Sequence, residues 1–182
     1  MRIATVGAGN VGGGLASLWE RAGHDVQRIG SGGGDVSGAD VALLAVPWEA
    51  IGDALGKANG IDGKPVIDAT NTPRGERPEG FASLAEYVKS LTGGPVAKAF
   101  NTNFARLYDR IGEARSRPGC LYCGDDEVKG VTAQLISDAG YEPIDAGGLE
   151  NASAVEDFLK ISFAVSNTMG RFFYRMALPD QL

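Results

Sequence analysis

The sequence has few of the residues that most often build metal, disulfide and acid-base sites. Its 182 residues include two cysteines, Cys120 and Cys123, and one histidine, His24. A structural zinc site needs about four such ligands, so we expect no metal centre. The Cys-x-x-Cys pair lies in an apolar segment typical of a strand, where residues three apart point to opposite faces, so we expect two buried thiols rather than a redox pair. We expect His24 to be a surface turn residue and not a catalytic base.

Positive charge and long apolar runs are also scarce. The chain carries 17 Lys and Arg against 23 Asp and Glu, a formal charge of -6. Proteins that bind nucleic acid usually cluster positive charge, so we expect no nucleic-acid partner. No run approaches the roughly 18 apolar residues of a membrane helix, and the chain starts as a strand rather than as a cleavable leader. We therefore expect a soluble, cytoplasmic protein without a membrane partner.

Glycine is the abundant residue, with 27 copies and no G-X-Y period or low-complexity tract. This excludes collagen-like and disordered chains, and the length suits a single domain over residues 1–182. Short apolar runs alternate with segments of helical spacing, which predicts an α/β fold of the Rossmann type: a doubly wound, mostly parallel sheet with a C-terminal helix. The strands are expected at residues 2–7, 25–29, 40–46, 65–69, 95–100, 119–123 and 142–145.

Two connections stand apart from this alternation. Residues 30–38 are too short and too rich in glycine for a helix, so a loop is expected between the second and third strands. After the last strand, residues 149–179 read as one long helix with many apolar and aromatic side chains. One terminal helix cannot cover all of them against its own sheet, so we expect a homodimer through this helix; packing on its own sheet alone is the alternative.

A glycine fingerprint follows the first strand and opens the first helix. Gly7-Ala8-Gly9-Asn10-Val11-Gly12 fits G-x-G-x-x-G in a βαβ unit of the expected size. Gly7 allows the tight turn, Gly9 lets backbone approach a pyrophosphate, and Gly12 allows close packing of helix on strand. The helix N-terminus, at Asn10 and Val11, supplies N–H groups and partial positive charge. The fingerprint predicts a dinucleotide site, with a glycine turn in a non-binding domain as the alternative.

The end of the second strand indicates which dinucleotide is bound. NAD enzymes usually carry Asp or Glu there for the ribose 2′-hydroxyl, but here Arg28, Ile29, Gly30 and Ser31 follow one another without a carboxylate. We expect Ser31 to bind a 2′-phosphate and Arg28 to lend charge, unless Arg28 faces solvent. The sequence therefore favours NADP.

The ends of the later strands should meet the rest of the ligand, because ligands of doubly wound folds lie beyond the carboxyl ends of the strands. An apolar lip suits the adenosine half and polar, uncharged groups suit the nicotinamide half. Asn after strands is also common as turn chemistry, which is the alternative for the two Asn residues. These side chains cannot act as acid or base, so no catalytic residue is expected. The expected residues are Ala45, Val46 and Pro47 for adenosine, and Thr70, Asn71, Asn101 and Thr102 near the nicotinamide.

Several of these motifs together resemble one family. They are the fingerprint at Gly7–Gly12 and the segments at 45–51, 67–71, 96–102, 124–126 and 145–149. The series resembles the NADPH-dependent reductases of 8-hydroxy-5-deazaflavin, coenzyme F-420, over nearly the whole chain. The resemblance implies a Rossmann domain that binds NADP, with Ala99–Thr102 near the nicotinamide and Gly147–Leu149 near a deazaflavin co-substrate.

The chain departs from that family at two points. The family usually has a helix after the second strand and an arginine beside the serine that reads the 2′-phosphate, and glycines replace both here. The expected function is hydride transfer between NADPH and a small-molecule acceptor, a deazaflavin coenzyme, by positioning alone. The alternatives are an NADPH-dependent reductase of flavin or another small acceptor, and a non-catalytic NADP-binding module.

Overall fold

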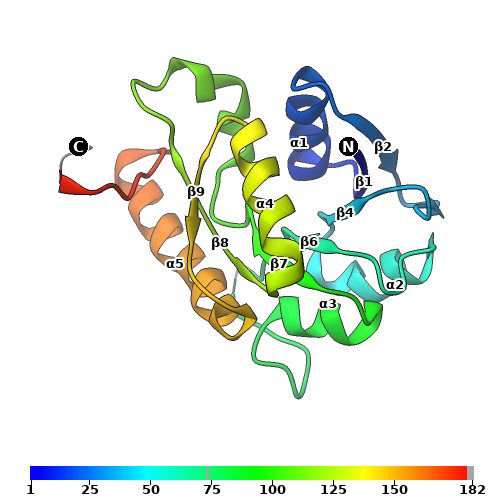
Figure 1. Ribbon diagram of the computed structural model, residues 1–182. Coiled ribbons are helices and arrows are strands. Elements are labelled where there is room, and N and C mark those ends of the chain that lie inside the picture. Colours follow the sequence, from blue (N-terminus) through cyan, green and yellow to red (C-terminus); the bar gives the residue numbers. More distant parts are fainter. Residues whose placement is uncertain (73, 180–182) are drawn as a thin grey trace.

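The protein is described by a computed structural model that covers residues 1–72 and 74–179 (Figure 1). Seven strands form one sheet in the order β2-β1-β4-β6-β7-β8-β9. All neighbouring pairs are parallel except β7 and β8, which are antiparallel. The expected doubly wound, mostly parallel sheet is confirmed. Its strands are β1 (Arg2–Val6), β2 (Asp25–Ile29), β4 (Val41–Leu44), β6 (Val66–Asp68), β7 (Val96–Ala99), β8 (Gly119–Gly124) and β9 (Glu142–Asp145).

Helices cover both faces of the sheet, and each face has its own core. One core contains Leu15 and Trp19 of α1 with Leu135 and Ile136 of α4. The other core contains residues of α2, α3 and α5. Each helix turns its apolar stripe to the sheet, as the spacing of three and four predicts. The helices are α1 (Asn10–Arg21), α2 (Ile51–Gly56), α3 (Leu84–Thr92), α4 (Asp126–Asp138) and α5 (Ala152–Met169), with 3₁₀ segments at Trp48–Ala50, Ala105–Glu113 and Leu149–Asn151.

The strand order sets the position of a ligand site. The chain leaves β1 for β2 on one side and then crosses to β4 on the other side of β1. The crevice between the carboxyl ends of β1 and β4 is the switch point at which doubly wound folds bind their ligands. The turn after β1 is the glycine fingerprint, so the fold places this fingerprint at the switch point.

The connection between β2 and β4 has no helix, as expected, but it carries a short strand that the sequence did not indicate. β3 (Gly34–Asp35) pairs in parallel with β5 (Ala58–Asn59), which follows α2. Gly, Asp, Ala and Asn are all uncommon in strands, so neither residue pair has a sequence signature of a strand. The small sheet fastens the glycine-rich loop to the end of α2.

The expected helix over residues 149–179 is wrong in its extent. A 3₁₀ turn occupies Leu149–Asn151, and α5 then ends at Met169. Gly170 has φ of 81°, a conformation outside the helical region that glycine adopts without steric cost and that ends the helix. The described chain beyond Gly170 forms no further α-helix and packs back on the protein through Phe172 and Tyr174.

The cysteines and the histidine gave one confirmed and one wrong expectation. Cys120 and Cys123 on β8 are free, buried and contribute to opposite cores, as expected. Burial raises the pKa of Cys120 to about 12 and that of Cys123 to about 11. His24, expected at the surface, has a side chain only 7% exposed, and its Nε2 lies 2.9 Å from Asp138 Oδ2. Asp138 is the last residue of α4, so this contact joins positions 114 residues apart and the local sequence cannot show it.

Within the described residues, no helix is both long and apolar enough to cross a membrane. The same residues contain no group of three or more His, Cys, Asp or Glu side chains arranged to hold a metal ion.

Candidate functional site

A cavity of about 290 Å³ lies at the switch point between β1 and β4. Its walls come from the glycine turn, the end of β2, the end of β4 and one side of α2. Six of the residues expected to bind the dinucleotide line it: Gly7, Gly9, Ser31, Ala45, Val46 and Pro47. A larger open hollow of about 700 Å³ lies at the C-terminal ends of α1 and α4, away from the carboxyl ends of the central strands.

The glycine turn has the geometry that the fingerprint predicts. Gly7 has φ of 105°, and a Cβ there would lie 2.3 Å from the carbonyl oxygen of Ala45. A Cβ on Gly12 would lie 1.9 Å from the carbonyl oxygen of Gly7. A Cβ on Gly9 would meet nothing within 4 Å. Gly7 and Gly12 are therefore required by packing, whereas Gly9 borders open space that a ligand can enter.

The N-terminus of α1 points to this open space. Gly9 is the N-cap and no side chain caps the helix, so its first N–H groups are available to an anion. No acidic residue lies in the first turn. Asn10 is exposed beside the turn, whereas Val11 packs against the core beneath it. The arrangement suits a phosphate group at Gly9 and Asn10.

A second, more open hollow of about 500 Å³ adjoins the other side of the same turn. It is bounded by Ala8–Asn10 and by the 3₁₀ segment after β7, which contributes Arg106. The exposed Arg106 was not among the expected residues, because nothing in the local sequence shows that the 3₁₀ segment Ala105–Glu113 packs against α1.

The two residues expected to bind a 2′-phosphate are placed differently. Ser31 lies in the lining of the switch-point cavity. Arg28 lies outside that lining and forms an ion pair with Glu20 of α1, with a further hydrogen bond to Ser17 Oγ at 3.2 Å. The hydrogen bond from Arg28 lowers the pKa of Glu20, and Glu20 raises the pKa of Arg28. Arg28 would have to leave this pair to meet a phosphate at Ser31.

The carboxyl ends of β6 and β7 bring the expected polar groups together. Asn71 Nδ2 donates to the carbonyl oxygen of Asn101 at 2.7 Å, and Asn101 Nδ2 donates to that of Val155 on α5 at 3.1 Å. The other side-chain oxygens, Asn71 Oδ1, Asn101 Oδ1 and Thr70 Oγ1, are buried without a hydrogen-bond partner. Buried polar atoms are normally paired, so these oxygens fit a ligand with N–H donors, such as a carboxamide. The side chain that stabilises the turn after β6 is that of Asp68, whose Oδ1 accepts a hydrogen bond from the N–H of Thr70.

Ala99 ends β7, and Phe100 and Thr102 lie on either side of Asn101 in the segment that follows. All three are buried, and Phe100 has φ of 62°, which is uncommon for a residue with a side chain. Thr102 Oγ1 lies 2.7 Å from Tyr174 Oη, which also accepts from the N–H of Leu121 at 2.8 Å. Burial raises the pKa of Tyr174, so its hydroxyl stays neutral. The segment after α5 thus packs against Thr102 and β8.

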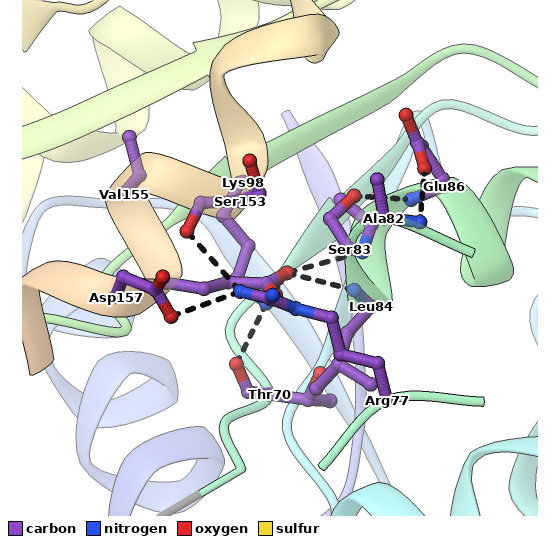
Figure 2. A network of polar contacts seen from close by, with 12 residues as sticks. Thr70, Arg77, Ala82, Ser83, Leu84, Glu86, Lys98, Ser153, Val155 and Asp157 are labelled. Carbon is purple, nitrogen blue, oxygen red and sulfur yellow. Dashed lines mark hydrogen bonds and ion pairs between the residues drawn. The ribbon is translucent and has the colours of Figure 1, made fainter. Parts of the chain in front are cut away.

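A buried ionic network supports the strand ends from below (Figure 2). Lys98 on β7 is fully buried, and its Nζ donates to Asp68 Oδ2 at 2.8 Å and to the carbonyl oxygen of Thr70 at 2.7 Å. Glu156 of α5 lies 3.1 Å from the same Nζ. Glu156 also accepts from the N–H groups of Leu84 and Ala85 at the start of α3.

Arg77 closes the network on its outer side. Its Nη2 donates to Asp157 Oδ1 at 2.9 Å, and its Nε lies 3.4 Å from Glu156 Oε2. Sequence reasoning missed this network. The available signal was a lysine within the apolar strand Val96–Ala99 and an aspartate in the strand next to it, because the register pairs Asp68 with Lys98. Its position beneath Thr70 fixes the backbone that presents the polar oxygens, and it places no acid or base in the cavity lining.

Comparison with known proteins places the fold. No model of a protein family matches the chain. The rat metalloreductase STEAP3 is 32% identical over 123 residues, which are 66% of this chain, and the chain spans about 25% of that protein. A candidate F-420-dependent NADP-reductase from Arthrobacter sp. FB24 has a TM-score of 0.80, with 21% identity and coverage of 98% of this chain and 100% of that one.

A reductive aminase from Aspergillus terreus, solved with NADPH and ethyl levulinate, has a TM-score of 0.68 with 14% identity, and covers 93% of this chain and 62% of that one. The chain has the fold of these reductases. The resemblance drawn from the motifs is therefore confirmed at the level of the fold, and what the chain binds and reduces is inferred below.

Proposed function

We propose that the chain is an oxidoreductase that binds NADPH across the switch point and transfers a hydride between it and a deazaflavin coenzyme of the F-420 type. The observation that carries the proposal is the pairing of an uncapped helix N-terminus at Gly9 with three unpaired buried oxygens at the ends of β6 and β7. The first suits a pyrophosphate and the second a carboxamide, which are the two polar parts of a nicotinamide dinucleotide.

The residues divide the work of positioning. The turn at Gly7–Gly12 holds the pyrophosphate, and Ala45, Val46 and Pro47 cover the adenosine. Asn71 and Asn101 orient the carboxamide, with their amide nitrogens already committed to backbone oxygens. When bound, the nicotinamide and the deazaflavin supply all the redox chemistry, since both are two-electron carriers. The protein contributes alignment and exclusion of water.

Two comparisons support the reductase part of the proposal and differ on the acceptor. The neighbour from Arthrobacter supports a deazaflavin. The similarity to a metalloreductase favours a second candidate, an NADPH-dependent reductase of flavin or another small acceptor. A third candidate, a non-catalytic NADP-binding module, is supported by the missing helix and arginine after β2.

Acceptor turnover separates the three candidates. Purified protein is mixed with NADPH, or with NADH, and with oxidised deazaflavin, FMN or a quinone, and loss of acceptor absorbance is followed. Turnover of deazaflavin with NADPH alone is expected. Turnover of FMN or the quinone without deazaflavin would support the second candidate, and tight NADPH binding without any turnover would support the third.

We further propose a homodimer through α5 and the segment after it. Large apolar side chains are exposed there, among them Ile161, Phe163, Met169 and Met176. Several large exposed apolar side chains on one terminal segment are typical of a surface that contacts another protein. Light scattering at micromolar concentration should give twice the chain mass, and Ile161→Glu should give the monomer; a monomeric wild type would remove this proposal.

A further inference from the structure

The loop after β2 lacks the helix and arginine of the resembled family, yet it is not a loose connection. The N–H of Gly34 donates to the carbonyl oxygen of Lys57 at 3.0 Å, and β3 pairs with β5 immediately after that residue. Gly33 has φ of 77°, and a Cβ there would lie 2.4 Å from the carbonyl oxygen of Lys57. Glycine is therefore required for the loop to lie against Lys57, which brings Ser31 and Lys57 to one cavity.

Lys57 supplies the positive charge in that cavity. Among the described residues that line the cavity, Lys57 is the only cation and Asp53 the only anion. Lys57 Nζ donates to Asp53 Oδ2 at 2.7 Å, one helical turn away. The two side chains are 48% and 67% exposed, so the pair is solvated and Lys57 can leave it at small cost. Arg28, in contrast, is held outside the cavity by Glu20.

We propose that Lys57, together with Ser31, recognises the 2′-phosphate of NADPH and replaces the missing arginine of the loop. The inference rests on the proposed function, because it assumes that a nicotinamide dinucleotide occupies the switch point. A phosphate beside Ser31 competes with Asp53 for the ammonium group of Lys57. Asp53 therefore weakens NADPH binding, and its charge repels the phosphate directly.

A competing assignment gives Asp53 the role of binding the 2′-hydroxyl of NADH. Carboxylates take that role at the end of the second strand in NAD enzymes. Here Asp53 lies on α2 and already accepts from Lys57, and residues 28–34 carry no carboxylate. Lys57, and not Asp53, is therefore the residue that binds the substituent at the 2′ position of the ribose.

The test compares the dissociation constants of NADPH and NADH, measured by fluorescence of the nicotinamide that both share. Lys57→Ala should raise the constant for NADPH at least tenfold and leave that for NADH within twofold. Lys57→Arg should keep the preference for NADPH. Asp53→Asn should lower the dissociation constant of NADPH, which means tighter binding. Lys160→Ala is the matched control, since Lys160 is 55% exposed in a comparable helical ion pair with Asp157. It should change neither constant.

Adenosine 2′,5′-bisphosphate, used as a competitor, removes the nicotinamide from the comparison. Lys57→Ala should weaken its binding more than that of AMP. An equal loss of NADPH and NADH, or a preference for NADPH that survives Lys57→Ala, would overturn the assignment while leaving the proposed function in place. Selective loss of NADH in Asp53→Asn would overturn it in favour of the 2′-hydroxyl reading. Wild-type protein that binds neither nucleotide would contradict the proposed function itself.

Discussion

Replacement of Gly9 by alanine separates binding from folding at the glycine turn. Gly9 has φ of -75° at the N-cap of α1, a conformation open to any residue, and a Cβ there would meet nothing within 4 Å. The change should therefore cost at most about 1 kcal/mol of stability, the usual penalty for alanine at an N-cap. The new methyl group would nevertheless occupy the space through which a pyrophosphate approaches the helix N-terminus.

The loss of affinity follows from the hydrogen bonds that this approach permits. A hydrogen bond to a charged group contributes about 1.5–3 kcal/mol, so loss of one should raise the dissociation constant of NADPH roughly 10- to 150-fold. Fluorescence titration measures the constant and urea unfolding measures the stability. Gly130→Ala is the control, because Gly130 lies within α4 with nothing within 4 Å of its Cβ position. It should stabilise the protein by about 1 kcal/mol and leave NADPH binding unchanged.

An unchanged constant for NADPH in folded Gly9→Ala protein would refute the placement of the pyrophosphate. Gly12→Ala cannot serve as this test, because its Cβ would lie 1.9 Å from the carbonyl oxygen of Gly7 and would disturb the turn itself.

Two further predictions concern the buried groups. Glu156→Ala should lower the free energy of unfolding, measured in urea, by about 3–5 kcal/mol, because it removes one of the two carboxylates that pair with the buried charge of Lys98 and leaves the N–H groups of Leu84 and Ala85 unpaired. Asp157→Ala, which changes a 47% exposed side chain, should lower it by less than about 1 kcal/mol. Equal effects of the two substitutions would contradict the role of the network. The thiols should be inert to a disulfide reagent at pH 8 and become reactive on unfolding. Burial raises the pKa of Cys120 from 9.0 to about 12, so the unfolded chain loses this proton at lower pH than the folded protein does. The free energy of unfolding should therefore fall by up to about 1.4 kcal/mol per pH unit between pH 9 and 12 because of Cys120, and Cys120→Ala should make this fall less steep. The same alkaline slope in wild type and variant would contradict this.

The sequence predicted the parts of the fold that depend on local pattern. Apolar runs located all seven strands of the main sheet to within about two residues, and the glycine fingerprint located the switch point. The loop after β2 was expected because its glycines cannot hold a helix. The extent of α5 was missed because apolar side chains continue past Gly170, where backbone conformation rather than hydrophobicity ends the helix.

The parts of the site that sequence reasoning missed depend on contacts between distant segments. Lys98 meets Glu156, 58 residues later, only because α5 packs back against β8 and α3. Lys57 and Ser31 line one cavity only because the loop after β2 pairs with the segment after α2 as β3 and β5. His24 is covered by Asp138 in the same way. Each of these residues is charged or polar in an unremarkable local context, so only the fold gives it a role.

The most direct test of the central claim is a crystal structure of the protein with NADPH. We expect the pyrophosphate at the N–H groups after Gly9, the adenosine against Ala45–Pro47, and the carboxamide within hydrogen-bond distance of Asn71 and Asn101. A nucleotide bound instead in the hollow at the C-terminal ends of α1 and α4, or absent from the switch point at saturating concentration, would contradict it.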